Sequence, residues 1–160
     1  MKKIIVIGCP GSGKTTFSQK LQAKTQIPLY HLDSIWHKAD RTHISRDEFD
    51  KQLEHILGGG SWIIDGNYQR TLERRIAACD TVFLFDLPTK TCLEGAIARI
   101  GQKRPDMPWI DTDLDPSLEK EITAFRQEKL PEIYDLLDKY KDSLSSIVFK
   151  SREESDEYLN

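Results

Sequence analysis

Apolar residues along the chain occur in short unbroken runs that alternate with longer stretches of helical spacing. The run over residues 4–7 is continuous and β-branched, which is typical of a strand buried on both faces of a parallel sheet. Residues 81–85 form a similar run that ends before an Asp-Leu-Pro sequence. We expect five strands, over residues 4–7, 27–32, 62–64, 81–85 and 146–149.

Helical spacing fills the intervals between these runs. Phe17 and Leu21 give an apolar face to a helix that follows a glycine-rich turn. Ser45 and Glu48 form a capping-box pattern, and we expect the glycines at 58–60 to end that helix by turning left-handed. Further helices are expected at about 72–77, from 89 to 100, from 117 onward with an interruption at 131, and after 151.

The order of these elements predicts the architecture. Strands and helices alternate, which favours a three-layer α/β fold with a mostly parallel sheet and right-handed crossovers. Residues 101–116 lack periodicity and contain three prolines, so they are expected to form a surface excursion. The chain has no internal repeat or linker, which predicts one domain over residues 1–160.

Composition and charge narrow the class of partner. The 160 residues include 23 Lys and Arg and 26 Asp and Glu, for a formal charge of −3, so bulk charge does not favour a nucleic acid as partner. No apolar stretch approaches the roughly 18 residues that span a bilayer. The odd count of three cysteines, without metal-ligand spacing, favours a reduced compartment. We therefore expect a cytoplasmic protein without a membrane partner.

Residues 8–15 match the pattern GxxxxGK[ST]. Glycines let the backbone N–H groups curl around phosphate oxygens, and the following helix adds its positive N-terminal end. Lys14 supplies a charge for the β- and γ-phosphates, and the Thr15 hydroxyl can ligate Mg²⁺. A chance glycine turn is the alternative, but the preceding strand and following helix favour phosphate binding. The nucleotide-binding residues are then Gly8, Cys9, Pro10, Gly11, Ser12, Gly13, Lys14, Thr15 and Thr16, with the Cys9 thiol expected only to pack behind the loop.

Three carboxylates stand where strands are expected to end, and ligands collect at that edge of an α/β sheet. Asp65 is the candidate for the metal shell, against a purely structural role in the turn. Asp33 is expected to bind the acceptor or act as a base, or else to cap a loop. Asp86 is expected to cap its strand. His31 would share a strand face with Asp33, and a hydrogen-bonded packing role is favoured for it over a catalytic one.

Other side chains leave two interpretations open. Arg70 and Arg74, four residues apart and followed by Arg75, either share a helix face directed at an acidic acceptor or form a solvated surface. Tyr30, Trp36 and Tyr68 either stack on a base or sugar or pack in the core.

Four segments together resemble one family: Gly-Cys-Pro-Gly-Ser-Gly-Lys-Thr-Thr at 8–16, Tyr-His-Leu-Asp at 30–33, Trp-Ile-Ile-Asp-Gly-Asn-Tyr at 62–68 and Arg-Pro-Asp-Met-Pro-Trp at 104–109. They are similar to the adenylate-kinase-like P-loop proteins called DNA topology modulation protein (FlaR-like). Phe-Asp-Leu-Pro at 85–88 and Asp-Gly at 65–66 also resemble adenylate kinases proper.

The resemblance implies a P-loop NTPase fold with sheet order 2-3-1-4-5, an acceptor-binding segment at about 33–60 and a short lid at about 100–116. It places Asp65 on the metal-associated aspartate, and Arg99 and Arg104 on lid arginines, a residue type suited to bidentate phosphate contact. The chain lacks a full adenylate kinase acceptor domain, and Asn67-Tyr68 replaces Phe-Pro. AMP is therefore not the expected acceptor.

The sequence thus predicts an ATP- and Mg²⁺-dependent phosphotransferase with an unidentified small acceptor. Its catalytic residues would be Lys14, Asp33, Arg99 and Arg104, and its metal ligands Thr15 and Asp65. The alternative is a DNA-associated regulator switched by nucleotide binding, for which the arginines at 70–75 and 99–104 would form a basic stripe. Neither the acceptor nor the oligomeric state follows from the sequence.

Overall fold

A computed structural model describes residues 1–160, with five parallel strands in one sheet. The sheet order is β2-β3-β1-β4-β5, so the predicted fold class and order 2-3-1-4-5 are confirmed. The strands are β1 (Lys3–Gly8), β2 (Leu29–His31), β3 (Trp62–Asp65), β4 (Thr81–Phe85) and β5 (Ser145–Phe149). β1 is the central strand, and all four of its residues from 4 to 7 are fully buried.

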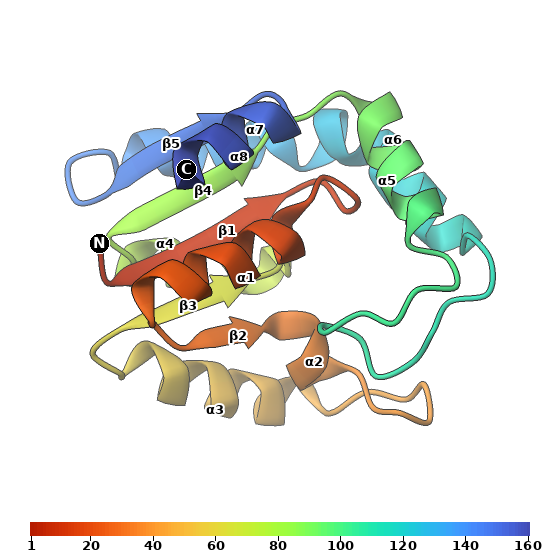
Figure 1. The fold of residues 1–160 in the computed structure, drawn as a ribbon. Helices are drawn as coiled ribbons and strands as arrows, with labels where there is room; N and C mark the ends of the chain where they lie inside the picture. The colour runs from red at the N-terminus through yellow and green to blue at the C-terminus, as the bar shows by residue number, and fades with distance from the viewer.

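Helices cover both faces of the sheet, which makes the three layers that the pattern predicts (Figure 1). α1 and α8 lie on one face, and α4 and α7 lie on the other, while α5 and α6 pack against each other at one end. The helices are α1 (Lys14–Thr25), α2 (Leu32–Trp36), α3 (Arg46–Leu57), α4 (Gln69–Ala78), α5 (Thr89–Ala98), α6 (Pro116–Glu128), α7 (Leu130–Lys139) and α8 (Arg152–Leu159). No helix is long and apolar enough to span a bilayer.

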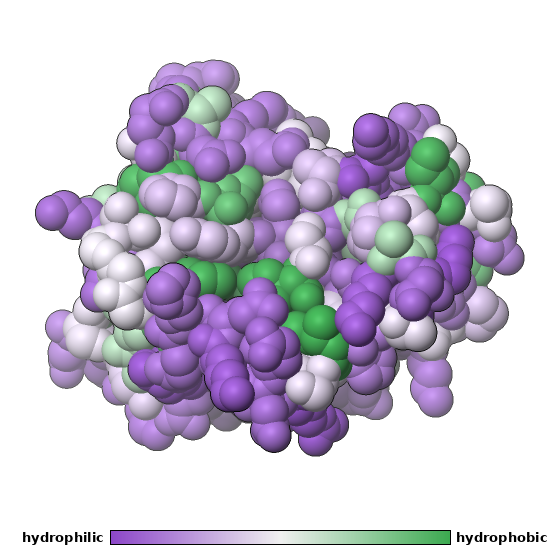
Figure 2. All heavy atoms as spheres, turned by 90° about the horizontal axis from the view of Figure 1, so that it is seen from below, coloured by the Kyte–Doolittle hydropathy of each residue, from purple (hydrophilic) through white to green (hydrophobic).

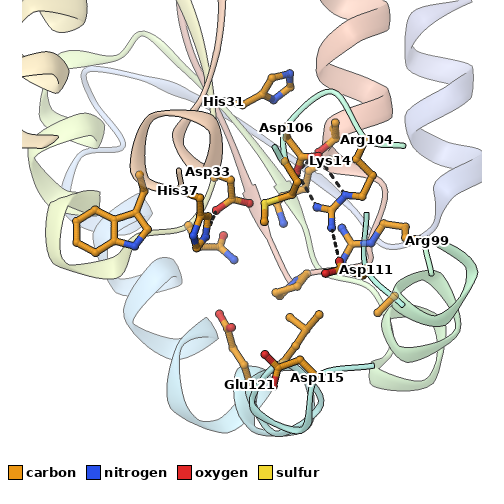
Figure 3. Close-up of a pocket in the computed structure, with 18 of the residues that line it drawn as sticks. Lys14, His31, Asp33, His37, Arg99, Arg104, Asp106, Asp111, Asp115 and Glu121 are labelled. Carbon is orange, nitrogen blue, oxygen red and sulfur yellow. Dashed lines mark hydrogen bonds and ion pairs between the residues drawn. The ribbon is translucent and has the colours of Figure 1, made fainter. Parts of the chain in front are cut away.

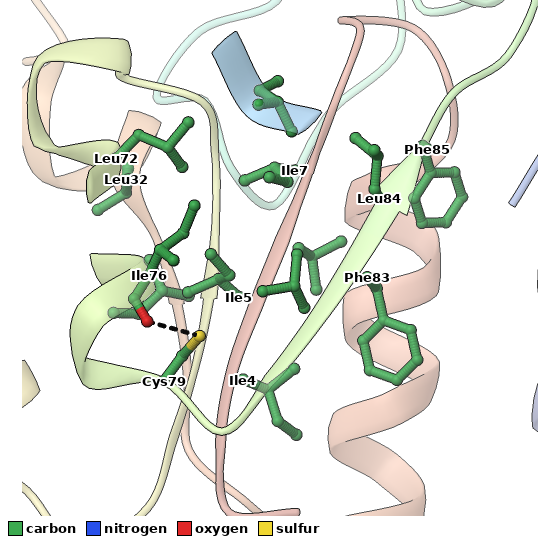
Figure 4. Packing of buried hydrophobic residues seen from close by; sticks show 14 of the residues in the cluster. Ile4, Ile5, Ile7, Leu32, Leu72, Ile76, Cys79, Phe83, Leu84 and Phe85 are labelled. Atoms are coloured by element: carbon green, nitrogen blue, oxygen red, sulfur yellow. Dashed lines mark hydrogen bonds between the residues drawn. The ribbon is translucent and has the colours of Figure 1, made fainter. Parts of the chain in front are cut away.

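The core lies on both sides of β1 and β4 (Figure 4). Phe83 points toward α1, where its ring centroid lies 4.9 Å from that of Phe17. Ile76 and Leu72 of α4 fill the opposite side. Burying apolar side chains of this size stabilises a fold by about 2 kcal/mol each. The continuous apolar runs in the sequence follow from this two-sided burial.

On the face seen from below, hydrophilic side chains predominate and hydrophobic ones gather only in small patches (Figure 2). Large exposed apolar side chains are few along the whole chain, among them Ile97 and Ile110. Contiguous apolar surface is the usual mark of a docking face.

Two helix ends test the capping predictions. Ser45 Oγ accepts the Glu48 N–H over 3.1 Å, as the capping box predicts, and Ser151 caps α8 in the same way. The prediction that the glycines at 58–60 turn left-handed is wrong. Gly58 is right-handed with φ −72°, and none of the three has a positive φ. The last turn of α3 closes through the Gly58 N–H on Glu54 O instead.

β2 is shorter than expected, because the chain turns into the single short helix α2 at Leu32. Leu32 is fully buried and packs tightly on Gly66. A Cβ added to Gly66 would lie 3.0 Å from the Leu32 Cβ. Tertiary packing thus overrides the extended pattern. Asp33 lies on a helix, and the strand alternation that linked it to His31 does not apply.

Candidate active site

The loop between β1 and α1 needs its glycines for conformation and for space. Gly8, Gly11 and Gly13 have φ values of 144°, 85° and 104°, which side-chain-bearing residues rarely adopt. A Cβ on Gly11 would lie 2.1 Å from the Cys92 carbonyl oxygen on α5. No side chain caps the first turn of α1, so its N–H groups are available to an anion. The loop has the shape of a phosphate cradle.

Lys14 begins α1 and lines a cavity beside the loop. Its Nζ donates to Gly8 O over 2.9 Å and to Cys9 O over 3.3 Å. Both acceptors are neutral carbonyls, so the ammonium charge is not matched by a carboxylate. Cys9 itself is buried, as expected for a residue that packs behind the loop.

Three oxygen-bearing side chains gather at the end of β3. Thr15 Oγ1 donates to Asp65 Oδ2 over 3.1 Å and lies 3.5 Å from Asp106 Oδ2. Both carboxylates are buried. Hydroxyl and carboxylate oxygens are the donors that Mg²⁺ prefers, and Mg²⁺ usually takes only one or two carboxylates beside phosphate and water. The donor set fits that ion, although no three His, Cys, Asp or Glu side chains form a ready-made metal cluster.

His31, at the end of β2, approaches the same carboxylate, with Nδ1 2.9 Å from Asp65 Oδ2. Burial lowers the pKa of His31, but the hydrogen bond and negative charge of Asp65 outweigh it, so the pKa lies above 6.5. The imidazole therefore orients Asp65. The hydrogen-bonded role expected of His31 is confirmed, and its partner is Asp65, a candidate metal ligand.

Asp33 lies across the cavity from Lys14, on α2 (Figure 3). Its Oδ1 accepts the Tyr68 hydroxyl over 2.7 Å, and His37 Nε2 lies 4.0 Å away. Burial, reinforced by the charges of Asp106 and Asp65, raises the pKa of Asp33 against the opposing hydrogen bond from Tyr68. A carboxylate with a raised pKa is a stronger base than one with the ordinary pKa.

The segment after α5 brings two arginines to the cavity. Arg104 donates from Nε and Nη2 to both oxygens of Asp106, over 3.1 and 2.7 Å, and lies 3.6 Å from Asp111. Arg99 Nε is buried without a hydrogen-bond partner. Burial, with a smaller contribution from Arg104, lowers the pKa of Arg99. A buried N–H without a partner indicates a position for an anionic ligand.

These groups line one cavity of about 570 Å³, within the usual range for small-molecule sites. Its walls come from the phosphate loop, α2, the turn after β3, the segment between α5 and α6, and the start of α6. Lys14, Thr15, Asp33, Asp65, Arg99 and Arg104 all line it. The structure thus brings together every residue predicted for catalysis or metal binding, while their roles remain predictions.

Comparison with known proteins adds sequence and structural relatives, although no family model matches the chain. An 88-residue stretch, 54% of the chain, is 28% identical to adenylate kinases of Thermotoga neapolitana and Thermotoga maritima. The stretch spans 39% of the length of those relatives.

The similar solved structures cover nearly all of the chain. A shikimate kinase from Bacteroides thetaiotaomicron superposes with TM-score 0.58 at 14% identity, over 98% of this chain and 93% of its own. A gluconokinase from Sinorhizobium meliloti 1021 gives 0.57 at 12% identity, over 99% and 87%. The chain has the P-loop kinase fold. A sugar kinase from Janibacter sp. HTCC2649 shares it, with TM-score 0.56 at 14% identity over 99% and 90%.

Within this P-loop kinase fold, Arg70 and Arg74 form a solvated helix surface. Arg70 binds Asp50 through two hydrogen bonds of 2.8 and 3.1 Å, and Arg74 binds Glu54 through two of 2.8 Å. Neither arginine lines the cavity. The interpretation that they face an acidic acceptor is therefore wrong, and their ion pairs neutralise two of the five arginines of the basic stripe that a DNA-associated regulator would need.

Arg75 has a different role that the sequence did not indicate. It is fully buried and donates to the carbonyl oxygens of Gly66, Asn67 and Tyr68, which fixes the turn after β3. Burial lowers its pKa to about 9, so it is charged at neutral pH. Arg75 therefore positions Tyr68, whose φ of 38° is unusual for a residue with a side chain.

Asp106 is the main site residue that sequence reasoning missed. It sits among other aspartates in a stretch without periodicity, and only its place in the 104–109 motif, two residues after Arg104, could have marked it. Asp86, in contrast, does not line the cavity; it is buried and accepts from Arg126 and Tyr134, over 2.8 and 2.6 Å. Of the three aromatic candidates, Trp36 and Tyr68 line the cavity and Tyr30 does not.

Proposed function

We propose that this chain transfers the γ-phosphoryl group of ATP to a hydroxyl group of a small acceptor. The observation that carries the proposal is the convergence of three groups on one cavity. The uncompensated Lys14 ammonium lies at the phosphate loop, Thr15 and Asp65 offer oxygens next to it, and Asp33 faces them from α2.

At the nucleotide end, Lys14 and the N–H groups of the loop bind the β- and γ-phosphates. The unpaired Nε of Arg99 binds a further phosphate oxygen. Thr15 and Asp65 would hold Mg²⁺, with Asp106 as a neighbouring oxygen donor. Mg²⁺ would neutralise charge on the transferring group.

At the acceptor end, Asp33 takes the proton of the attacking hydroxyl. The acceptor oxygen forms a bond to the γ-phosphorus, the bond to the β–γ bridging oxygen breaks, and ADP leaves with that oxygen. Tyr68 holds the Asp33 carboxylate through Oδ1, which leaves Oδ2 for the acceptor. The raised pKa of Asp33 suits this proton transfer.

We also propose residues 33–60 as the acceptor-binding segment and 100–116 as the lid, in one domain of 160 residues. The motifs at 62–68 and 104–109 support membership of the FlaR-like group. Contact between the lid and the acceptor-binding segment is supported by Ser34 Oγ, which donates to Asp106 O over 2.9 Å and so joins the two segments.

A coupled assay of ADP release tests the proposal. Purified protein with Mg-ATP is offered nucleosides, nucleoside monophosphates, sugars and small acids, beside an acceptor-free control. We expect at least one acceptor to raise ADP release well above the control, and the Asp33→Asn variant to lose that increment. Nucleotide binding without acceptor-dependent ADP release across the panel would contradict the proposal.

A further inference from the structure

We infer that the acceptor is a hydroxyl compound without a phosphate or carboxylate group, neutral or positively charged. The inference rests on the proposed function and concerns the half of the same cavity that faces away from the phosphate loop. This acceptor half is bounded by α2, by the turn at 66–69 and by the first turns of α6.

Positive charge in the cavity is concentrated at its nucleotide end. Lys14 donates only to carbonyl oxygens and Arg99 Nε has no partner, and a bound triphosphate would take both. Arg104 is already paired with Asp106 and Asp111. These cations lie together on one side of the cavity in Figure 3. None of them is free to recognise a second anion.

One further cation, Lys129, lines the acceptor half, and it is also paired; Arg41, 4.8 Å from the Trp109 ring centroid, does not line the cavity. Lys129 Nζ lies 3.1 Å from Glu121 Oε1, and both residues line the cavity. No other lysine or arginine lines it. A phosphate or carboxylate on the acceptor would therefore find no free cationic side chain, whereas sites for such groups normally offer one.

Negative charge, in contrast, is abundant and partly unpaired. Asp33, Asp113 and Asp115 line the cavity with no lysine or arginine within ion-pair distance, and only His37 approaches Asp33. Asp115, which caps α6, and Glu121 of α6 project toward the cavity opposite Lys14 (Figure 3). An anionic acceptor would be placed between these carboxylates and the triphosphate, where like charges repel.

The remaining wall of the acceptor half is aromatic. Trp36 is fixed by a stacked His43 ring with centroids 4.3 Å apart, and Trp109 is held by Arg41, 4.8 Å from its ring centroid. Aromatic faces favour the apolar faces of sugars and rings and attract cations. Hydroxyl groups can meanwhile bond to carboxylates such as Asp33. The wall suits a neutral or cationic hydroxyl compound.

Matched acceptor pairs test the inference: adenosine against AMP, sorbitol against gluconate, and glucosamine against glucosamine 6-phosphate. For any pair of which the protein phosphorylates at least one member, we expect kcat/KM for ADP release to be at least about tenfold higher for the non-anionic member. A preference for the anionic member would overturn the inference and leave the proposed function intact. ADP release from no pair, together with the failure of the wider panel, would overturn both.

A charge variant tests the same point within the cavity. Glu121→Gln releases Lys129 and adds a free cation to the acceptor half, so kcat/KM for the anionic member relative to that for its neutral partner is expected to rise by about threefold or more. The matched control is Glu73→Gln, which releases Lys139 from an exposed ion pair outside the cavity. It should change neither value. An equal effect of Glu121→Gln on both acceptors would contradict the inference, and circular dichroism verifies that each variant is folded.

Discussion

The hydroxyl of Thr15 donates to Asp65 Oδ2 over 3.1 Å, although fifty residues of sequence separate the two. The contact joins the first turn of α1 to the carboxyl end of β3. His31 approaches the same oxygen from β2, so three elements meet at this one carboxylate. Such support from neighbouring groups is what orients ligands in metal sites.

Replacing Asp65 is expected to remove the Mg²⁺ dependence of nucleotide binding. In the wild type, Mg²⁺ should strengthen ATP binding, and in Asp65→Asn that gain should fall by about 10- to 100-fold, because a charged oxygen donor is lost. Isothermal titration calorimetry with and without Mg²⁺ measures the gain. Asp50→Asn, which alters only an exposed ion pair with Arg70, is the control and should bind as the wild type does. An undiminished Mg²⁺ effect in Asp65→Asn would exclude Asp65 as a ligand.

Replacing Asp33 is expected to lower the catalytic rate without lowering the stability of the fold. Asp33→Asn is expected to lower kcat by about 10²-fold or more with ATP binding retained, since general bases contribute roughly that much. Because the folded-state pKa of Asp33 is raised, its ionisation destabilises the folded protein. The variant should therefore be at least as stable as the wild type at neutral pH.

The pH dependence of the free energy of unfolding provides a separate test of the direction in which the pKa of Asp33 is shifted. Urea titrations should show the advantage of Asp33→Asn growing as the pH rises from the ordinary carboxyl value of 3.8 through the raised pKa, and then staying constant. An advantage that is largest in acid would show that the pKa of Asp33 is lowered.

The parts of the fold that depend on local pattern could be predicted from the sequence. Residues 4–7 and 81–85 are apolar throughout because helices cover both faces of the sheet, and Gly8, Gly11 and Gly13 are required by a tight loop. Such signals lie within a few residues of one another. They were enough to place the candidate phosphate site.

The parts of the fold and of the site that depend on contacts between distant residues could not be predicted from the sequence. Leu32 turns the chain into α2 because it packs on Gly66, thirty-four positions later, and this moves Asp33 off the strand. Asp106 matters because Arg104 and Thr15 approach it in three dimensions. Arg74 is directed outward because Glu54 lies on the neighbouring helix. The position of each of these side chains depends on which elements pack together, and the hydrophobic periodicity of the sequence does not determine that packing.

The close approach of α5 to the phosphate loop makes Gly95 a sensitive position. A Cβ there would lie 2.0 Å from Gly11 O, so Gly95→Ala must displace the loop backbone. We expect it to weaken ATP binding at least tenfold and to destabilise the fold by about 1–3 kcal/mol. Thermal unfolding and calorimetry measure the two effects.

Gly60→Ala is the matched control, because a Cβ at Gly60 meets nothing within 4 Å and its φ is not positive. It should leave binding unchanged and stability the same or slightly higher. If Gly95→Ala behaved like Gly60→Ala, the contact between α5 and the loop would not constrain the nucleotide site.

The central claim is that the loop at residues 8–15 binds the triphosphate of ATP through Lys14. Thermal unfolding of wild type and Lys14→Ala, each with and without saturating Mg-ATP, tests it most directly, because a ligand raises Tm only if it binds the folded state. The account predicts a rise of several degrees for the wild type and none for Lys14→Ala, with near-identical Tm values when no nucleotide is present. Equal shifts in both proteins, or no shift in the wild type, would contradict it.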